Sequence, residues 1–264
     1  MASSKASGAY WPFAPREVGA NRDTQLLKMI AMASMLVDHA GKMFFPQYPV
    51  MRIIGRLAFP IFAYCVAVGA VYSRNRLKYL TRMILTGLIS QPFYAMALNH
   101  TTPKMFAIAF RDNPVGAAVN FYVESWQSPN IMLTMTLGLL LVWAIRDRQL
   151  VCALAVALLT WKIQNSVNYG WRGVALIGLF YLFIGHWWIS FPVLTAYMAW
   201  WGVQGGTYHL FGVQFGIQMF AILALPLIYV PMNSGLRINK WVFYLFYPGH
   251  LMLIMLVRYV LNQG

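Results

Sequence analysis

The residues best suited to chemistry are a consecutive acid and imidazole, Asp38-His39, inside a long apolar run that begins near Leu26. An ionisable side chain in a membrane span costs at least about 2.5–3.5 kcal/mol, so each one needs a reason. Arg56 lies in the next apolar run, and both Asp38 and Arg56 fall about 10 Å from the same end of the hairpin by helical rise. We predict an Asp38–Arg56 ion pair. Helix neighbours point about 100° apart, so His39 is then free to face a cavity.

A second feature is the spacing of Lys28, which lies eleven residues before His39. Eleven helical steps return to nearly the same face of the helix, roughly 16 Å further along. A cation at the cytoplasmic end of the helix and an imidazole deep in the membrane suit a ligand whose anionic part stays at the cytoplasmic surface. The alternative interpretation is a snorkelling lysine at the helix start with a structural core histidine, and the spacing alone does not separate the two.

The composition indicates whether these residues lie in water or in a lipid bilayer. The chain has 264 residues, of which 60% are hydrophobic and 10% charged, with a mean hydropathy of +0.58. A soluble domain carries about 25% charged residues, so a soluble enzyme, a coiled coil, a disordered scaffold and a secreted disulfide framework are excluded. We predict an all-α, polytopic integral membrane helical bundle. Cys65 and Cys152 lie in apolar runs and are interpreted as small buried hydrophobes, and no His/Cys/Asp spacing predicts a metal site.

The apolar runs predict the domain organisation. A helix needs about 20 apolar residues to cross a bilayer. We expect about nine spans, with a range of eight to ten because three runs are short. A basic and aromatic arm over residues 1–24 precedes a single transmembrane domain over 25–261, with a long extracytoplasmic loop over 99–129. The predicted spans are 25–45, 50–73, 76–98, 130–145, 149–162, 170–185, 187–202, 212–231 and 241–260.

The charge balance predicts the orientation. The net charge is +14, from 20 Lys and Arg against six acids. In a soluble protein this excess would suggest nucleic acid, but in a membrane bundle it follows the positive-inside rule, so no nucleic-acid partner is expected. With nine spans, three basic connections share one side, which we therefore predict to be cytoplasmic together with the N-terminus. Their basic residues are Arg74, Arg76, Lys78, Arg82, Arg146, Arg148, Arg237 and Lys240.

Six blocks between about residues 25 and 258 form an ordered set. They are Leu27–Ala31 running on to Val37-Asp38-His39, Gly55–Ala63, Leu88–Phe93, Asn130–Thr134, Asn168-Tyr169-Gly170 with Gly173, and Phe243–Leu251 with its Tyr247-Pro248-Gly249-His250. This set resembles the TraX family, membrane proteins associated with N-terminal acetylation of conjugative pilin. The family is similar to wider transmembrane acyltransferases, in which a basic residue stands eleven positions before a functional histidine. Lys28 and His39 reproduce that spacing, with Lys in place of the usual Arg.

The resemblance implies acetyl transfer from cytoplasmic acetyl-CoA to the N-terminal amine of a pilin subunit, presented at the outer side of a bacterial inner membrane whose lipids surround the protein. His39 would act as a general base or carry the acetyl group itself. The implied catalytic group is His39, Asp38, Arg56 and His250. The residues expected to hold the CoA phosphates are Lys28, Arg74, Arg76, Lys78 and Arg82. Those expected to meet the acceptor or stabilise an oxyanion are Gln91, Asn130, Tyr169 and Tyr247.

Two other functions stay open at this stage. The same amine could attack the pilin's own C-terminal carbonyl, which would make the protein a head-to-tail cyclase. The protein could instead be a non-enzymatic pilin chaperone or insertion partner, or a transporter that uses Asp38, Arg56 and His250, because paired embedded charges also occur in proton relays. Saturable binding of acetyl-CoA would distinguish the acetyltransferase from these alternatives.

Overall fold

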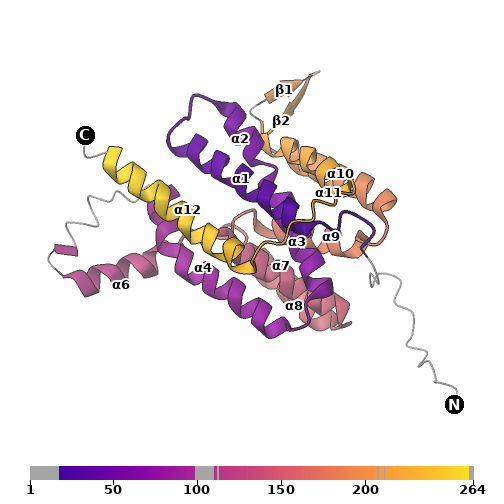
Figure 1. Cartoon of the computed structure of the whole chain (residues 1–264), viewed down its shortest axis with the longest axis horizontal. Helices are drawn as coiled ribbons and strands as arrows, with labels where there is room; N and C mark the ends of the chain where they lie inside the picture. Colours follow the sequence, from indigo (N-terminus) through magenta and orange to yellow (C-terminus); the bar gives the residue numbers. More distant parts are fainter. Residues whose placement is uncertain (1–17, 99–109, 112, 207, 211, 262–264) are drawn as a thin grey trace, which may run out of the picture.

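The computed structural model describes residues 18–98, 110–111, 113–206, 208–210 and 212–261. Most of the predicted N-terminal arm falls outside these residues. So do His100, Lys104 and Asp112 of the predicted 99–129 loop. Over the described residues the fold is almost entirely α-helical, as predicted (Figure 1).

The helices follow the predicted spans closely in order and position. They are α1 Thr24–Met43, α2 Pro49–Gly55, α3 Ala58–Tyr72, α4 Arg76–Leu98, α6 Pro114–Ser125, α7 Ile131–Arg146, α8 Leu150–Lys162, α9 Gly170–Phe183, α10 Trp187–Gly202, the 3₁₀ helix η1 Ile217–Leu223, α11 Ala224–Tyr229 and α12 Lys240–Leu261. One antiparallel hairpin joins β1 Tyr208–Leu210 to β2 Val213–Phe215.

The predicted span 50–73 is interrupted, because α2 ends at Gly55 and α3 begins at Ala58. The cause is Pro60, which has no N–H to offer the carbonyl of Arg56 and whose ring crowds that carbonyl. The chain turns there through tighter bonds, from Arg56 N to the Ile53 carbonyl at 3.0 Å and from Leu57 N to the Ile54 carbonyl at 3.2 Å. Arg56 therefore lies in the turn between two helices.

Two further predictions about elements are corrected. The 99–129 connection contains a helix, α6, which begins with Pro114 after an Asn113 side chain that accepts a hydrogen bond from Gly116 N. Asparagine at the cap and proline at the first position favour a helix start. The span predicted over 212–231 begins with strand β2, because Gly212 (φ +78°) turns the chain back on β1.

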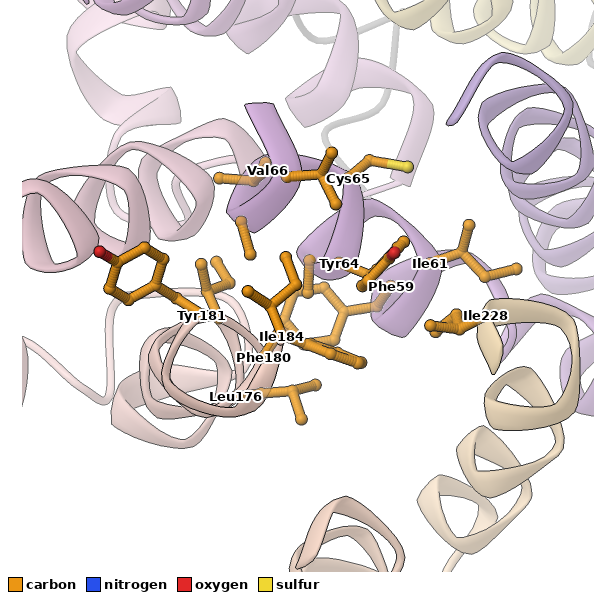
Figure 2. Close-up of a cluster of buried hydrophobic side chains, with 14 of the residues drawn as sticks. Phe59, Ile61, Tyr64, Cys65, Val66, Leu176, Phe180, Tyr181, Ile184 and Ile228 are labelled. Atoms are coloured by element: carbon orange, nitrogen blue, oxygen red, sulfur yellow. The ribbon is translucent and has the colours of Figure 1, made fainter. Parts of the chain in front are cut away.

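Helix α3 lies at the centre of the molecule and packs against α1, α7, α9 and α11. Figure 2 shows its side chains, among them Phe59 and Tyr64, facing those of α9. The Tyr64 and Phe180 rings meet edge to face with centroids 5.6 Å apart. Because α3 is covered on almost every side, its sequence is apolar all round, as expected of a core helix.

The last residues of the predicted arm pack onto this core. The Tyr64 hydroxyl donates to the Asn21 carbonyl at 2.6 Å, and Asn21 N donates to the Ile228 carbonyl at 3.1 Å. Asp23 caps α1 by accepting from Leu26 N, and it also accepts from the Ser234 hydroxyl. The hydrogen bonds from Ser234 hold the pKa of Asp23 below its usual value. Residues 18–23 thus tie the start of α1 to the segment before α12.

Large apolar side chains cover much of the outer surface. On α8 the side chains of Leu150, Val151, Leu154 and Leu158 are all exposed, Val151 to 82%. Among the described residues, the α2–α3 segment Pro49–Tyr72 and the helix Lys240–Leu261 are long and apolar enough to cross a membrane, and several shorter helices are also apolar. Exposed apolar surface on this scale marks contact with a membrane or another protein.

Candidate functional site

The site centres on two histidines from helices far apart in sequence. His39 lies on α1 and His250 on α12, after Pro248. Nδ1 of His39 is 2.9 Å from Nε2 of His250, and the two rings lie nearly parallel, with centroids 5.1 Å apart. The opposite nitrogen of His250, Nδ1, is 2.9 Å from the carbonyl oxygen of Phe246.

These contacts fix the tautomers of the neutral pair. A carbonyl can only accept, so Nδ1 of His250 carries a hydrogen and its Nε2 has a free lone pair. That lone pair accepts from Nδ1–H of His39, which leaves Nε2 of His39 without a proton. Within the described part of the chain, Nε2 of His39 has no hydrogen-bond partner. The chain of hydrogen bonds from the Phe246 carbonyl through His250 thus leaves Nε2 of His39 able to act as a base.

The predicted ion pair is present beside His39. Arg56 Nη2 lies 2.7 Å from Asp38 Oδ1, and both side chains are only 11% exposed. Arg52, which the sequence interpretation did not single out, lies 2.6 Å from the other carboxylate oxygen, Oδ2. Gly55 permits this approach, because a Cβ built there would come within 2.2 Å of the Asp38 side chain.

His39 and the ion pair line a cavity of about 230 Å³, the outer cavity. Its cations are Lys42, Arg52 and Arg56, and Asp38 is its one acid among the described residues. Its other polar side chains are His39, Tyr94, Asn168, Tyr169 and Tyr247. Tyr94 and Asn168, which the sequence interpretation also missed as site residues, are joined by a 3.0 Å hydrogen bond from Asn168 Nδ2 to the Tyr94 hydroxyl.

A second cavity of about 350 Å³, the inner cavity, adjoins the first. The two share five lining residues, Met35, Phe62, Ile131, Met135 and Tyr247. The inner cavity is otherwise mainly apolar, but three cations, Lys28, Arg82 and Lys240, line it. The two cavities therefore lie side by side, with three cations in the lining of one and His39 in the lining of the other.

The predicted cofactor residues divide into two groups. Lys28 and Arg82 line the inner cavity, where they lie over the Phe243 and Tyr244 rings at 5.2 and 5.5 Å from the centroids. Arg82 Nε is buried without a hydrogen-bond partner among the described residues. Outside both linings, Arg76 forms a bidentate ion pair with Asp147, and Arg74 and Lys78 are exposed. Lys240, considered from sequence only as an orientation signal, joins the lining.

The four residues predicted to contact the acceptor substrate also fall into two groups. Tyr169 and Tyr247 line the outer cavity. Gln91 and Asn130 line neither cavity and bond each other, because Gln91 Oε1 accepts from both Asn130 N and Asn130 Nδ2 at 2.9 Å. Asn130 also caps α7 and donates to the Gly87 carbonyl. Their hydrogen-bonding groups join α4 to α7, and a direct role with the acceptor stays a prediction.

The described residues contain no group of three or more His, Cys, Asp or Glu side chains able to hold a metal ion. The chemistry that their arrangement supports is proton transfer at His39 and stabilisation of negative charge by the neighbouring guanidinium groups.

Comparison with known proteins adds an independent finding. The sequence profile of the TraX protein family matches residues 23–258. A probable fimbrial assembly protein, FimC of serogroup H1 from Dichelobacter nodosus, is 29% identical over 244 residues, which cover 86% of this chain and 92% of that protein. An uncharacterized protein, RP591 from Rickettsia prowazekii (strain Madrid E), is 26% identical over 159 residues, or 58% of this chain and 52% of that protein. No solved structure matches.

Proposed function

Because the chain belongs to the TraX protein family, we propose that it is an inner-membrane acetyltransferase that modifies the N-terminal amine of a pilin subunit, with acetyl-CoA as donor. The name of the Dichelobacter relative, a probable fimbrial assembly protein, supports the pilin substrate. The observation that carries the proposal is a pair of neighbouring cavities, one lined by three cations and the other by an imidazole base.

The inner cavity suits the donor. Lys28, Arg82 and Lys240 would hold the phosphates of CoA near the cytoplasmic surface, and the mainly apolar wall beyond them would surround the pantetheine arm. Lys28 precedes His39 by eleven residues on α1, which separates them by roughly 16 Å. An extended arm anchored at these cations would place its thioester near the residues that both cavities share.

The outer cavity suits the transfer step. Nε2 of His39 would take a proton from the acceptor amine as its nitrogen attacks the thioester carbonyl. A C–N bond forms, the C–S bond breaks, and the sulfur leaves as a thiolate that receives the proton from His39, which restores the base. Arg56 Nη1, which is free of partners among the described residues, would stabilise the oxyanion. The excess of cations in the cavity also disfavours an ammonium and so favours the free amine, the form that reacts.

The test combines binding with mass spectrometry. Purified protein should bind acetyl-CoA saturably, and pilin made with the unaltered protein should be heavier by one acetyl group than pilin made with His39→Ala. His209→Ala removes a histidine that lines neither cavity and should leave the pilin acetylated.

Other outcomes would overturn the proposal. If the protein binds no acetyl-CoA and the pilin mass does not depend on it, the acetyltransferase proposal fails. A pilin that loses one water without any need for CoA would identify a cyclase instead. If His39→Ala leaves the acetyl group in place, the base assigned here is wrong.

A further inference from the structure

The outer cavity holds more positive charge than its own residues neutralise. Lys42, Arg52 and Arg56 line it, and Asp38 is the single acid among the described lining residues. Both oxygens of Asp38 are engaged, one by each arginine. Lys42 is exposed, but the side chains of Arg52 and Arg56 are only 28% and 11% exposed, and partly buried cations that share one counterion are costly, so the cavity favours an anion brought from outside.

The other described acids are committed elsewhere. Asp23 caps α1 and accepts from Ser234, Asp147 pairs with Arg76, and Glu124 is exposed on α6. None of them lines the outer cavity. Lys42 is partly satisfied, because its Nζ donates to the Leu98 carbonyl at 3.2 Å, but a carbonyl leaves its charge uncompensated.

Arg52 is the cation best placed to meet such an anion. Its side chain is 28% exposed against 11% for Arg56, so it is the more accessible of the two arginines paired with Asp38. Only Nη1 contacts Asp38; Nη2 and Nε of Arg52 have no hydrogen-bond partner among the described residues. Asp38 fixes one side of the guanidinium and leaves a planar pair of donors open, a geometry that matches a carboxylate.

We infer that Arg52, supported by Lys42, binds a carboxylate of the acceptor close to its reacting amine, so that the protein prefers acceptors with an acidic side chain in their first residues. This inference rests on the proposed function and deepens it. Arg52 and His39 line the same cavity, so a group bound to Arg52 shares that cavity with the base. The cavity of about 230 Å³ is smaller than the roughly 300–1,000 Å³ of sites for drug-sized ligands, which limits the bound segment to one or two residues.

The experiment uses the full-length protein in phosphatidylcholine nanodiscs, which contain no anionic lipid, with acetyl-CoA and two short peptides. Both peptides have a free N-terminal alanine and differ only in Asp or Asn at the second position. The unaltered protein should acetylate the Asp peptide with a kcat/KM about tenfold higher, the size expected for one charge-assisted contact. Arg52→Gln should remove this preference, while Arg52→Lys, which keeps the charge, should retain part of it.

A matched control and a folding check make the result decisive. Lys162→Gln removes a cation that lines neither cavity and should keep the preference for Asp. Binding of acetyl-CoA by Arg52→Gln shows that the variant is folded. Equal rates for the Asp and Asn peptides with the unaltered protein overturn the inference but leave the proposed function standing. A preference that survives Arg52→Gln overturns the assignment to Arg52. Failure to acetylate either peptide, with no binding of acetyl-CoA, counts against the proposed function and the inference together.

Discussion

At the scale of single residues, His250 tests whether the tautomer of His39 matters. His250→Phe removes the acceptor for Nδ1–H of His39, so the imidazole can present either nitrogen to the cavity. We expect kcat to fall about 100-fold, the lower range for loss of general base catalysis, with little change in the affinity for acetyl-CoA. The measurement is single-turnover acetylation together with equilibrium binding of acetyl-CoA.

The matched variant is His250→Gln, whose amide oxygen can accept from Nδ1–H of His39. It should retain more activity than His250→Phe at equal thermal stability. If the two variants are equally active, His250 does not set the tautomer of His39.

Helical rise and residue spacing predicted part of this site. Asp38 and Arg56 were paired from their equal depth in a helical hairpin, and the structure contains that pair. Arg52 stands four residues before Arg56, a spacing that places both on one side of a helix, so a signal for it existed. Asn168 carried no such signal, because its place beside Tyr94 depends on how α4 meets the start of α9.

At the scale of helices, Gly55 sets how closely α2 approaches α1. A Cβ at this position would lie 2.2 Å from Cβ and from Oδ1 of Asp38, so Gly55→Ala must push the helices apart or displace the carboxylate. We expect a loss of about 1–3 kcal/mol, the range for overpacking of a tight contact. Thermal unfolding in detergent, followed by circular dichroism, measures it.

The control is Gly249→Ala on α12, where an added Cβ meets nothing within 4 Å. That change should be neutral or stabilising, because alanine favours a helix by up to about 1 kcal/mol over glycine. If both variants unfold at the same temperature as the unaltered protein, the close approach of α1 and α2 does not limit stability.

The lengths of the apolar runs predicted where helices occur. These lengths failed to predict the elements where a proline, a glycine or a helix cap changes the local backbone structure. Pro60 divides the second predicted span at Arg56. Proline breaks helices, but a count of apolar residues along a run does not detect such a break. Gly212 converts the start of the eighth run into a hairpin. Asn113 with Pro114 marked the start of α6, but the charged residues, prolines, asparagines and serines of the 99–129 stretch favoured a loop.

At the scale of the whole molecule, cations donate hydrogen bonds to helix-end carbonyls at both ends of the bundle. At the end predicted to be outside, Lys42 and Arg258 donate to the carbonyls of Leu98 and Met96 at the C-terminus of α4. Such contacts stabilise a helix end and hold these charges in fixed positions. At the opposite end, Arg146 likewise donates to the carbonyls of Ala70 and Val71 near the end of α3, whereas Arg74 and Lys78 are exposed, the kind of basic charge that the positive-inside rule counts.

The basic residues clustered around Arg74 predict the orientation of the protein in its membrane, with this end in the cytoplasm. Helix α4 has 23 residues and is about 35 Å long by helical rise, enough to separate its two ends across a hydrocarbon core of about 30 Å. Arg74 precedes its first turn, and Gln127 lies beyond its far end, before α7. In a background without Cys65 and Cys152, Gln127→Cys should react with a membrane-impermeant maleimide on intact spheroplasts. Arg74→Cys should react only after the membrane is opened. The reverse pattern would place the cations of the inner cavity outside the cell, away from the cytoplasmic acetyl-CoA on which the proposed reaction depends.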